Sequence, residues 1–383
     1  MILGIDASNL RVGGGVTHLT ELLGAARLPL HGFSQVIVWS GSRTLKRIEE
    51  QPWLRKAHEP VLDEGLLRRA MWQRTRLSAA ARAAACDVLL VPGGTYAGDF
   101  HPVVTMSRNL LPFEWRELRR YGWSRMALKT FLLRLTQTRS FRRADGLIFL
   151  TDYAREAVTR VTGDIRGRAA TVPHGIDTRF VLVPRPQRPI ESFSASQPFR
   201  ILYVSIIDMY KHQWHVAEAV ASLRAGGLPI TLELVGPAYP PAMKRLRATL
   251  ARVDPRGEFI HCPGAVSHDA LPARYAQADL CVFASSCENM PNILLEAMAS
   301  GLPIACSRLG PMPELLGDGG VYFDPERPQD IAHALRNLIE SPALRAQLAQ
   351  RSFARAGAYS WQRCADETFA FLATCARSAE RPA

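Results

Sequence analysis

The chain has 383 residues, 47% of them hydrophobic and 21% charged, which is an ordinary balance for a globular protein and a length that favours two domains. The seven cysteines include no C-x-x-C pair, so we expect neither disulfides nor a zinc site. No uncharged apolar run reaches about eighteen residues, and the chain opens without a basic segment or a long apolar region, so we expect neither a membrane span nor a signal peptide. The net charge of +12 lies mainly in residues 1–180, where 27 Lys/Arg stand against 16 Asp/Glu (+11), but no helix-turn-helix, RRM or finger pattern points to nucleic acid.

Strand-like apolar runs alternate with helical patterns through the first half, which is typical of parallel sheets built from βαβ units. The pattern predicts strands at 2–6, 35–39, 87–91, 103–106 and 146–150, and helices at 68–85, 114–144 and 151–161. Three glycines at 13–15 follow the first strand, and they either form a simple turn or let backbone N–H groups approach an anion. A nicotinamide dinucleotide is disfavoured, because the second strand ends without the acidic residue that would bind its ribose.

The most basic segment is 108–143, which carries 10 basic and 2 acidic side chains (+8) interleaved with tryptophan, phenylalanine and leucine. Such a helix suits an anionic membrane surface or an acidic lipid-linked substrate. The alternative is a helix that packs against its own domain and keeps its charged face in water.

Residues 181–198 interrupt the alternation with four prolines and a serine-rich patch, which predicts a linker between domains. A second series follows, with strands expected at 200–204, 230–235, 258–261, 279–283, 303–306 and 321–323, and helices at 328–339, 342–356 and 361–376. The predicted fold class is therefore α/β, with one Rossmann-like domain at 1–180 and another at 199–360. We expect their parallel sheets to face a central cleft, because ligands bind at the carboxyl ends of the strands in such folds.

The segment 288–303, ENMPNILLEAMASGLP, is the most informative stretch because it places two carboxylates around a helix start. Glu288 lies in the loop after a predicted strand, and Glu296 lies about one turn into a helix closed by Gly301 and Pro303. The helix N-terminus adds backbone N–H groups and the positive end of its dipole. This combination suits a ligand that carries both phosphate and hydroxyl groups, such as a nucleotide sugar.

Other candidate residues also follow predicted strands. Lys211 is either a surface lysine or a positive charge for a pyrophosphate, and its place after a strand favours the second. Arg108 and Asn109 could contact a sugar or an acceptor, and His174 is either such a contact or a structural residue. Glu314 is interpreted as a carboxylate stabilised at a helix start. No D-x-D triplet, Walker A loop or G-x-S-x-G elbow is present, so a leaving diphosphate would be stabilised by basic side chains and helix dipoles, without a metal.

Five motifs occur in a fixed order along the chain. They are the glycines at 13–15, PHGID at 173–177, the lysine loop at 203–211, E(x)7E at 288–296 and PELLGDGG at 313–320. Together they resemble the family 4 retaining glycosyltransferases, which have the GT-B fold, over nearly the whole chain. The resemblance implies an acceptor-binding first domain, a second domain that binds the nucleotide sugar, and a final helix at 361–383 that crosses back to the first domain.

The resemblance also implies a role for each matching residue. Glu288 would bind hydroxyls of the donor sugar, Glu296 would bind the ribose, and Lys211 would neutralise the departing phosphate. Arg108 and Asn109 complete the expected catalytic set, while His174 would contact the acceptor or the sugar. The remaining expected donor contacts are Gly14, Gly15, Ser205, His212, Val266, Met290, Pro291, Asn292 and Leu295.

The chain departs from the family pattern at two places. Ser205-Ile206 stands where Gly-Arg is usual, so one expected phosphate-binding cation is missing, and Arg108-Asn109 stands where His-Asp is common. We hypothesise that Arg108 or His212 supplies the missing positive charge. The tract 208–214 is similar to bacterial polysaccharide mannosyl- and rhamnosyltransferases, so these departures are interpreted as a subgroup trait.

The resemblance thus implies a metal-independent hexosyltransferase that retains anomeric configuration, with a nucleotide diphosphate sugar as its co-substrate and no cofactor. GDP-mannose or a GDP- or dTDP-linked rhamnose is the favoured donor. The expected acceptor is a lipid-linked or surface polysaccharide, such as a lipopolysaccharide O-antigen, presented to a cytoplasmic protein at the inner face of the membrane. The alternatives are a non-catalytic GT-B protein that binds a glycan or a partner, and a nicotinamide-dependent dehydrogenase.

Overall fold

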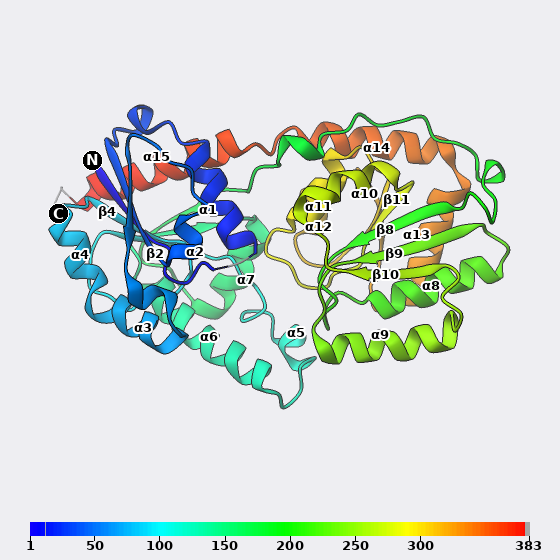
Figure 1. The fold of residues 1–383 in the computed structure, drawn as a ribbon, viewed down its shortest axis with the longest axis horizontal. Coiled ribbons are helices and arrows are strands. Elements are labelled where there is room, and N and C mark those ends of the chain that lie inside the picture. Colours follow the sequence, from blue (N-terminus) through cyan, green and yellow to red (C-terminus); the bar gives the residue numbers. More distant parts are fainter. Residues whose placement is uncertain (12, 380–383) are drawn as a thin grey trace. The chain divides into compact units, whose positions relative to one another are not determined.

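The computed structural model describes residues 1–11 and 13–379, and within them the chain forms two compact units. Among these residues, the first unit comprises those of Met1–Leu118, those of Trp123–Gly175 and those from Ser360 onward, and the second comprises Arg119–Gly122 and Ile176–Tyr359. Figure 1 shows a twisted sheet with helices on both faces in each unit.

The first unit is built on a parallel sheet of seven strands in the order β3-β2-β1-β4-β5-β6-β7. The strands are β1 (Ile2–Asp6), β2 (Gln35–Ser40), β3 (Leu54–His58), β4 (Val88–Val91), β5 (Val103–Met106), β6 (Gly146–Phe149) and β7 (Arg168–Thr171). The four residues of each of β4, β5 and β6 are all buried, which explains why these sequences are apolar except for Thr105.

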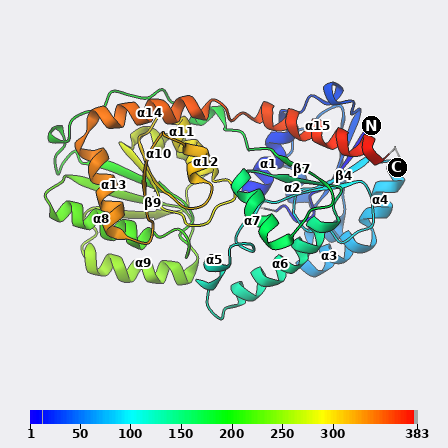
Figure 2. The same ribbon diagram turned by 180° about the vertical axis from the view of Figure 1, so that it is seen from behind.

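Helices cover both faces of this sheet. They are α1 (Gly14–Gly24), α2 (Ser42–Leu45), α3 (Leu66–Thr75), α4 (Leu77–Ala83), α5 (Trp115–Arg119), α6 (Arg125–Arg143), α7 (Asp152–Thr162) and α15 (Trp361–Ala379). Helix α15, red in Figures 1 and 2, packs against α1 and across β4, β5 and β6. On the other face, Trp72 of α3 and Leu77 of α4 join a buried cluster with Trp39, Leu89 and Val103 of the strands.

The second unit repeats the design with six parallel strands in the order β10-β9-β8-β11-β12-β13. These strands are β8 (Phe199–Val204), β9 (Ile230–Val235), β10 (Ile260–Gly264), β11 (Leu280–Phe283), β12 (Ile304–Ser307) and β13 (Val321–Phe323). Its helices are α8 (Gln213–Ala225), α9 (Pro240–Val253), α10 (Leu271–Gln277), α11 (Asn292–Ala299), α12 (Met312–Leu316), α13 (Pro328–Glu340) and α14 (Pro342–Ala356). Helix α8 packs against α9 and α13, and α11 packs against α12 and α14 (Figures 1 and 2).

The predicted α/β class with parallel sheets is confirmed, but several elements differ. Strands β3 and β7 were not predicted, and the helix expected at 68–85 is divided into α3 and α4. The helix expected at 114–144 is divided into α5 and α6, since Gly122 between them has a φ of +55°. In the segment expected as a linker, Leu182 donates a backbone hydrogen bond to the Ala299 carbonyl, so this segment packs on the second unit.

Candidate functional site

The strongest cluster of predicted site residues lies in the second unit, where the order of its strands reverses. Strands β8 and β11 are neighbours there, although 75 residues, 205 to 279, lie between them in the chain. The loops that leave their carboxyl ends are joined, because Ser286 donates its backbone N–H to the Tyr210 carbonyl at 2.8 Å. Doubly wound sheets bind their ligands at this kind of position.

Lys211 and Glu288 meet across these two loops. The Lys211 ammonium forms an ion pair with Oε1 of Glu288, and the exposed fractions of the two side chains are only 5% and 14%. The Lys211 ammonium also lies 5.2 Å from the ring centroid of Phe283 and 5.1 Å from that of Tyr210. Both predicted residues are therefore held together in a nearly buried environment, where electrostatic interactions are stronger than in water.

Glu296 lies one turn into α11, as predicted, and two other side chains hold its carboxylate. The Tyr275 hydroxyl donates to Oε2 at 3.3 Å, and Nε2 of His268 lies 3.6 Å from Oε1. Glu296 raises the pKa of His268 above its usual value, mainly by hydrogen bonding. Burial raises the pKa of Tyr275 and the nearby carboxylate adds to this effect, so the hydroxyl stays a donor.

The start of α11 carries the other donor-binding residues predicted from the E(x)7E segment. Its N-cap residue is Pro291, whose ring offers no side-chain hydrogen-bonding group, and Met290 lies buried beside it. Asn292 opens the helix, and Leu295 is fully buried beneath it. Val266 lies elsewhere in the same unit, in the loop between β10 and α10.

The structure gives Ser205 and His212 local roles. Ser205 is buried after β8, against Gly236, where an added Cβ would lie 2.1 Å from the Ser205 carbonyl oxygen. His212 is the N-cap of α8 with a φ of +53°, and its wholly buried ring lies 3.0 Å from the Ser286 hydroxyl through Nε2. These contacts fix the lysine loop, and a direct contact of either residue with a donor stays a prediction.

Gly14, Gly15 and Arg108 come together in the first unit. The Arg108 guanidinium donates to the Gly14 carbonyl at 2.7 Å and to the Gly15 carbonyl at 3.2 Å, at the start of α1. Burial lowers the pKa of Arg108 to about 10, so it stays charged at neutral pH. Asn109, which is exposed, accepts the Leu111 backbone N–H at 3.1 Å through its side chain.

His174 is packed rather than open. Its ring lies 4.7 Å from that of His18 and is stacked 5.7 Å from that of Trp361, and only 4% of the residue is exposed. A Cβ on the next residue, Gly175, would lie 2.1 Å from the Trp361 backbone nitrogen. These contacts account for His174 structurally, and its contact with an acceptor or a sugar stays a prediction.

Three residues of this cluster, His268, Tyr275 and Tyr210, were not predicted as site residues from the sequence. His268 follows β10 at the carboxyl edge of the sheet, so its position offered a signal, whereas Tyr275 lies within α10 and nothing local marks it. Among residues 1–11 and 13–379, no group of three or more His, Cys, Asp and Glu is arranged to hold a metal ion.

Residues 12–180 match the model described as Glycosyltransferase Family 4, and residues 198–341 match the model described as Glycosyl transferases group 1. The chain is 25% identical over 242 residues to O-antigen chain mannosyltransferase B of Escherichia coli, covering 60% of each chain. It is 27% identical over 236 residues to a GDP-mannose-dependent phosphatidylinositol dimannoside mannosyltransferase of Mycobacterium tuberculosis, covering 61% of this chain and 59% of that protein. These alignments thus span about three fifths of the relatives' lengths.

Solved structures resemble the whole fold. Sucrose-phosphate synthase from Thermosynechococcus elongatus superimposes with a TM-score of 0.71 at 19% identity, covering 96% of this chain and 97% of that one. WaaG, a glycosyltransferase involved in lipopolysaccharide biosynthesis, gives 0.70 at 16% identity, covering 97% and 99%. HepE of Anabaena, solved in complex with UDP-glucose, gives 0.66 at 17% identity, covering 99% and 100%. The fold is GT-B, and with the two matching models this places the chain in glycosyltransferase family 4.

Proposed function

We propose that this protein transfers a hexose from a nucleotide diphosphate sugar, with retention of anomeric configuration. The observation that carries this proposal is the pairing of Lys211 with Glu288 at the carboxyl ends of β8 and β11. Glu296, at the start of α11 in the same unit, supplies a second carboxylate for hydroxyl groups. A cation, two carboxylates and a helix N-terminus match a ligand that combines phosphates with sugar hydroxyls.

The proposed chemistry depends on charge and position. The C–O bond between the sugar and the diphosphate breaks while the acceptor hydroxyl attacks the same face, and its proton passes to the leaving phosphate oxygen. Lys211 would stabilise the negative charge on that oxygen, and Glu288 would orient the sugar through its hydroxyls. Neither carboxylate is assigned as a nucleophile, so the contribution of the protein is positioning and electrostatic stabilisation.

Mannose is the donor sugar we favour, with rhamnose second. Two of the relatives named above are mannosyltransferases, one of them described as GDP-mannose-dependent, which supports GDP as the nucleotide. The test is thermal melting of the full chain with GDP, UDP, dTDP and ADP, because a ligand at a hundred times its Kd stabilises the folded state by about 2.7 kcal/mol. We expect GDP to raise the Tm, and Glu296→Gln to abolish the shift while the exposed control Glu340→Gln retains it.

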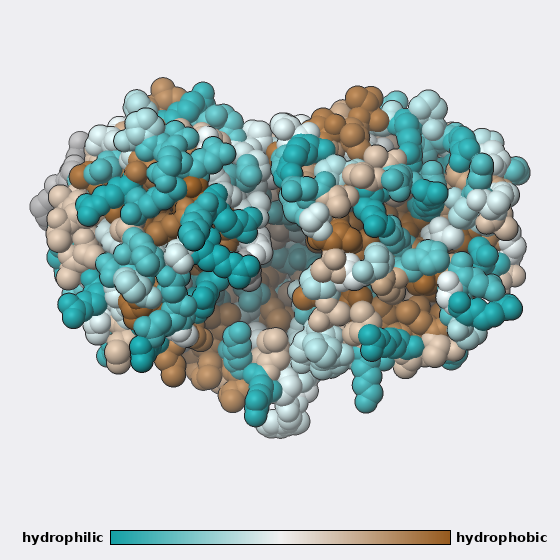
Figure 3. Space-filling view, in the orientation of Figure 1, coloured by the Kyte–Doolittle hydropathy of each residue, from teal (hydrophilic) through white to brown (hydrophobic). Residues whose placement is uncertain are grey.

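The acceptor we propose is a lipid-linked or surface polysaccharide at the inner face of the cytoplasmic membrane. Along α6, Leu128, Phe131, Leu132 and Leu135 are 41% to 61% exposed, and their spacing places them on one helix face. The patch appears in brown along the lower edge of the first unit in Figure 3. An exposed apolar stripe beside basic residues supports contact with an anionic bilayer.

Vesicle flotation tests this membrane contact. Phe131→Ser/Leu132→Ser should reduce binding to vesicles of phosphatidylglycerol and phosphatidylethanolamine. The matched control is Leu67→Ser/Met71→Ser, which removes two exposed apolar residues from α3 and should leave binding unchanged. Equal binding by the wild type and both variants would contradict the proposed membrane contact. No helix among the described residues has the length and apolar character needed to cross a bilayer.

The second candidate is a non-catalytic glycan- or partner-binding protein. Ile206, which is 37% exposed, occupies the position after β8 where the family pattern has an arginine, and this favours the candidate. The nearly buried Lys211–Glu288 pair argues against a non-catalytic protein, because an ion pair that is removed from water and has no function costs stability. No Tm shift with any nucleotide in the panel would favour this second candidate.

A further inference from the structure

A cavity of about 1180 Å³ opens in the first unit, and none of the predicted site residues lines it. Its walls include residues that immediately precede β5, β6 and β7, such as His101, Asp145 and Gly167. All strands of this sheet are parallel, so their amino-terminal ends share one edge. Gly15 and Arg108 follow β1 and β5 at the opposite edge, where such sheets ordinarily bind ligands. The cavity therefore lies at the amino-terminal edge of the sheet, and is distinct from a ligand site at the carboxyl edge.

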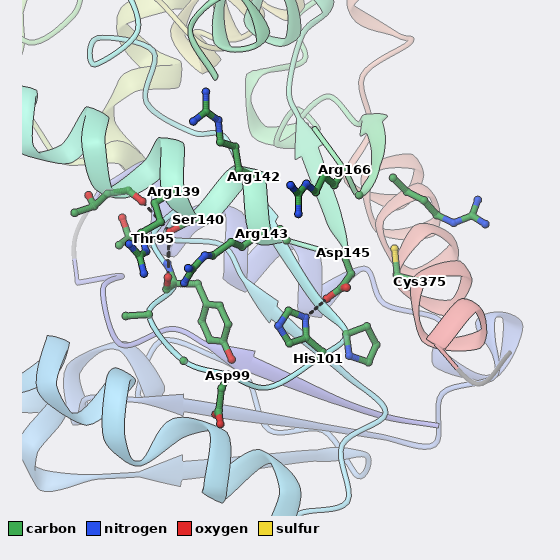
Figure 4. Close-up of a pocket in the computed structure, with 18 of the residues that line it drawn as sticks. Thr95, Asp99, His101, Arg139, Ser140, Arg142, Arg143, Asp145, Arg166 and Cys375 are labelled. Carbon is green, nitrogen blue, oxygen red and sulfur yellow. Dashed lines mark hydrogen bonds and ion pairs between the residues drawn. The ribbon is translucent and has the colours of Figure 1, made fainter. Parts of the chain in front are cut away.

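Arginines dominate this cavity, which we call the arginine cavity. They come from α3, from the last turns of α6, and from the segment at the start of β7: Arg74, Arg139, Arg142, Arg143, Arg166 and Arg168. The Arg142 guanidinium donates from Nε to the Thr162 carbonyl at 2.5 Å. Within the described residues the other five guanidinium groups have neither a hydrogen bond nor an ion pair. Figure 4 shows Arg139, Arg143 and Arg166 around the same hollow.

The two carboxylates of the lining do not neutralise these arginines. Asp99 pairs with Arg82, outside the lining, at 3.2 Å. Asp145 accepts the Val103 backbone N–H at 2.7 Å and contacts Nδ1 of His101 at 2.7 Å through the same oxygen (Figure 4). Six arginines and two aspartates leave the lining at +4 with histidine neutral.

The walls are fixed by their own hydrogen bonds. The Ser140 hydroxyl of α6 accepts the Tyr96 N–H at 2.9 Å and donates to the Tyr96 carbonyl at 3.1 Å. The Tyr96 hydroxyl in turn accepts the Phe100 N–H at 2.7 Å. Near the opposite wall, an added Cβ at Gly167 would lie 2.3 Å from the Ala144 carbonyl oxygen, so the two segments touch. These contacts hold the backbone from which the exposed arginine side chains extend.

We propose that the arginine cavity binds a ligand through two or more phosphate or phosphodiester groups. The planar guanidinium fork matches phosphate oxygens in pairs, and several unpaired forks match several negative charges. The volume exceeds that of one phosphate and lies somewhat above the range of about 300–1,000 Å³ that is usual for ligand sites. This inference does not depend on the proposed transferase activity, because no residue of the cavity belongs to the candidate donor site.

The geometry allows two sources for these phosphates, a soluble polyphosphate or anionic lipid headgroups. The lipid source is supported by α6, where the helical spacing places Arg139, Arg142 and Arg143 on the same exposed face as the stripe Leu128, Phe131, Leu132 and Leu135. A bilayer that contacts the stripe would present its phosphates along the axis of the same helix. The shared chemistry is phosphate recognition, and the experiment separates the sources.

The experiment compares two double variants of the full chain in 150 mM salt. Arg143→Ala/Arg166→Ala removes two unpaired arginines of the cavity. Arg47→Ala/Arg55→Ala removes the same charge from exposed positions in the same unit, outside the cavity. Both carry Lys211→Ala, as does the reference protein, so that phosphate binding in the candidate donor site does not obscure the result. Binding is measured by calorimetry with inorganic tripolyphosphate and by flotation with phosphatidylglycerol vesicles.

We expect the cavity variant to weaken binding of at least one probe tenfold or more, and the control to weaken it less than twofold. A loss with tripolyphosphate alone assigns a soluble ligand, and a loss with vesicles alone assigns lipid headgroups. Equal losses in both variants would show that only overall charge matters and would overturn the proposal. Unchanged binding in the cavity variant, or no binding of either probe by the reference protein, would overturn it as well.

Discussion

Lys211 forms an ion pair with Glu288 in the second unit, although the two residues lie 77 positions apart in the chain. The pair exists because β8 and β11 are neighbours and their loops are joined through Ser286 and Tyr210. Each of the two charges compensates the other. A bound diphosphate would offer Lys211 a second anionic partner, and sugar hydroxyls would offer Glu288 neutral donors, so the pair is suited to reorganise when a donor enters.

Replacing Lys211 should damage catalysis more than stability. Lys211→Ala is expected to lower kcat by a factor of about 10² to 10³, the usual loss when one preorganised donor to a developing anion is removed. The control is Lys244→Ala, an exposed lysine of α9 in the same unit, which should behave like the wild type. Release of nucleoside diphosphate measures both variants, and a Lys211→Ala enzyme with full kcat would exclude the proposed role.

The stability of the protein should fall as the pH rises above about 6.5, because of His268. Glu296 raises the pKa of this histidine in the folded protein, so the added stability is complete below its unfolded value, about 6.5, and disappears as the pH rises through the folded value. The His268 side chain is 45% exposed, so we expect less than about 1 kcal/mol. Thermal melts of wild type, His268→Gln and the exposed control His333→Gln should show a smaller pH-dependent loss only in His268→Gln. The same loss in all three proteins would contradict the assignment.

Arg108 should act by holding the glycine loop at the start of α1. Arg108→Ala removes its hydrogen bonds to the Gly14 and Gly15 carbonyls and should cost about 1–3 kcal/mol of unfolding free energy, measured in urea. Arg108→Lys separates this role from the hypothesis of a missing phosphate-binding cation, because lysine keeps the charge but not the fork. If Arg108→Lys loses stability but retains turnover, the positive charge of Arg108 is what catalysis needs. If it loses both stability and turnover, Arg108 acts by positioning the glycine loop.

Gly175 should tolerate no side chain. A Cβ there would lie 2.1 Å from the Trp361 backbone nitrogen, and backbone atoms on both sides leave little freedom to move apart. Gly175→Ala should therefore destabilise the protein by about 1–3 kcal/mol or more. Gly24→Ala is the matched control, because nothing lies within 4 Å of its added Cβ at the end of α1. A Gly175→Ala protein that melts like Gly24→Ala would show that the approach of the two segments is looser than described.

Apolar runs predicted the fold well where burial is complete. The sequences of β4, β6 and β11 are continuous apolar runs because both faces of these strands are covered. Strands β3 (LRKAH) and β7 (RAAT) lie at the sheet edges and contain basic residues, so no apolar run marks them. In the same way, the division between α5 and α6 depends on the positive φ of Gly122, which the spacing of apolar residues does not predict.

The candidate site was predictable only in part, for a related reason. Local sequence placed Glu288 in a loop and Glu296 one turn into α11, and the structure agrees. Contacts between distant segments decide the rest. Tyr275 reaches Glu296 from α10, and His268 reaches it from the loop after β10, although neither belongs to the motif that contains Glu296. The adjacency of β8 and β11, which brings Lys211 to Glu288, is likewise a property of the strand order.

The most direct test of the account is donor turnover by the purified full chain. Release of nucleoside diphosphate should be measured with GDP-mannose, dTDP-rhamnose and UDP-glucose, together with the anomeric configuration of the released or transferred sugar by NMR. We predict release from one donor, retention of configuration, and a decrease in kcat by a factor of about 10² or more in Lys211→Ala. Inverted configuration, or turnover that Lys211→Ala leaves unchanged, would contradict it.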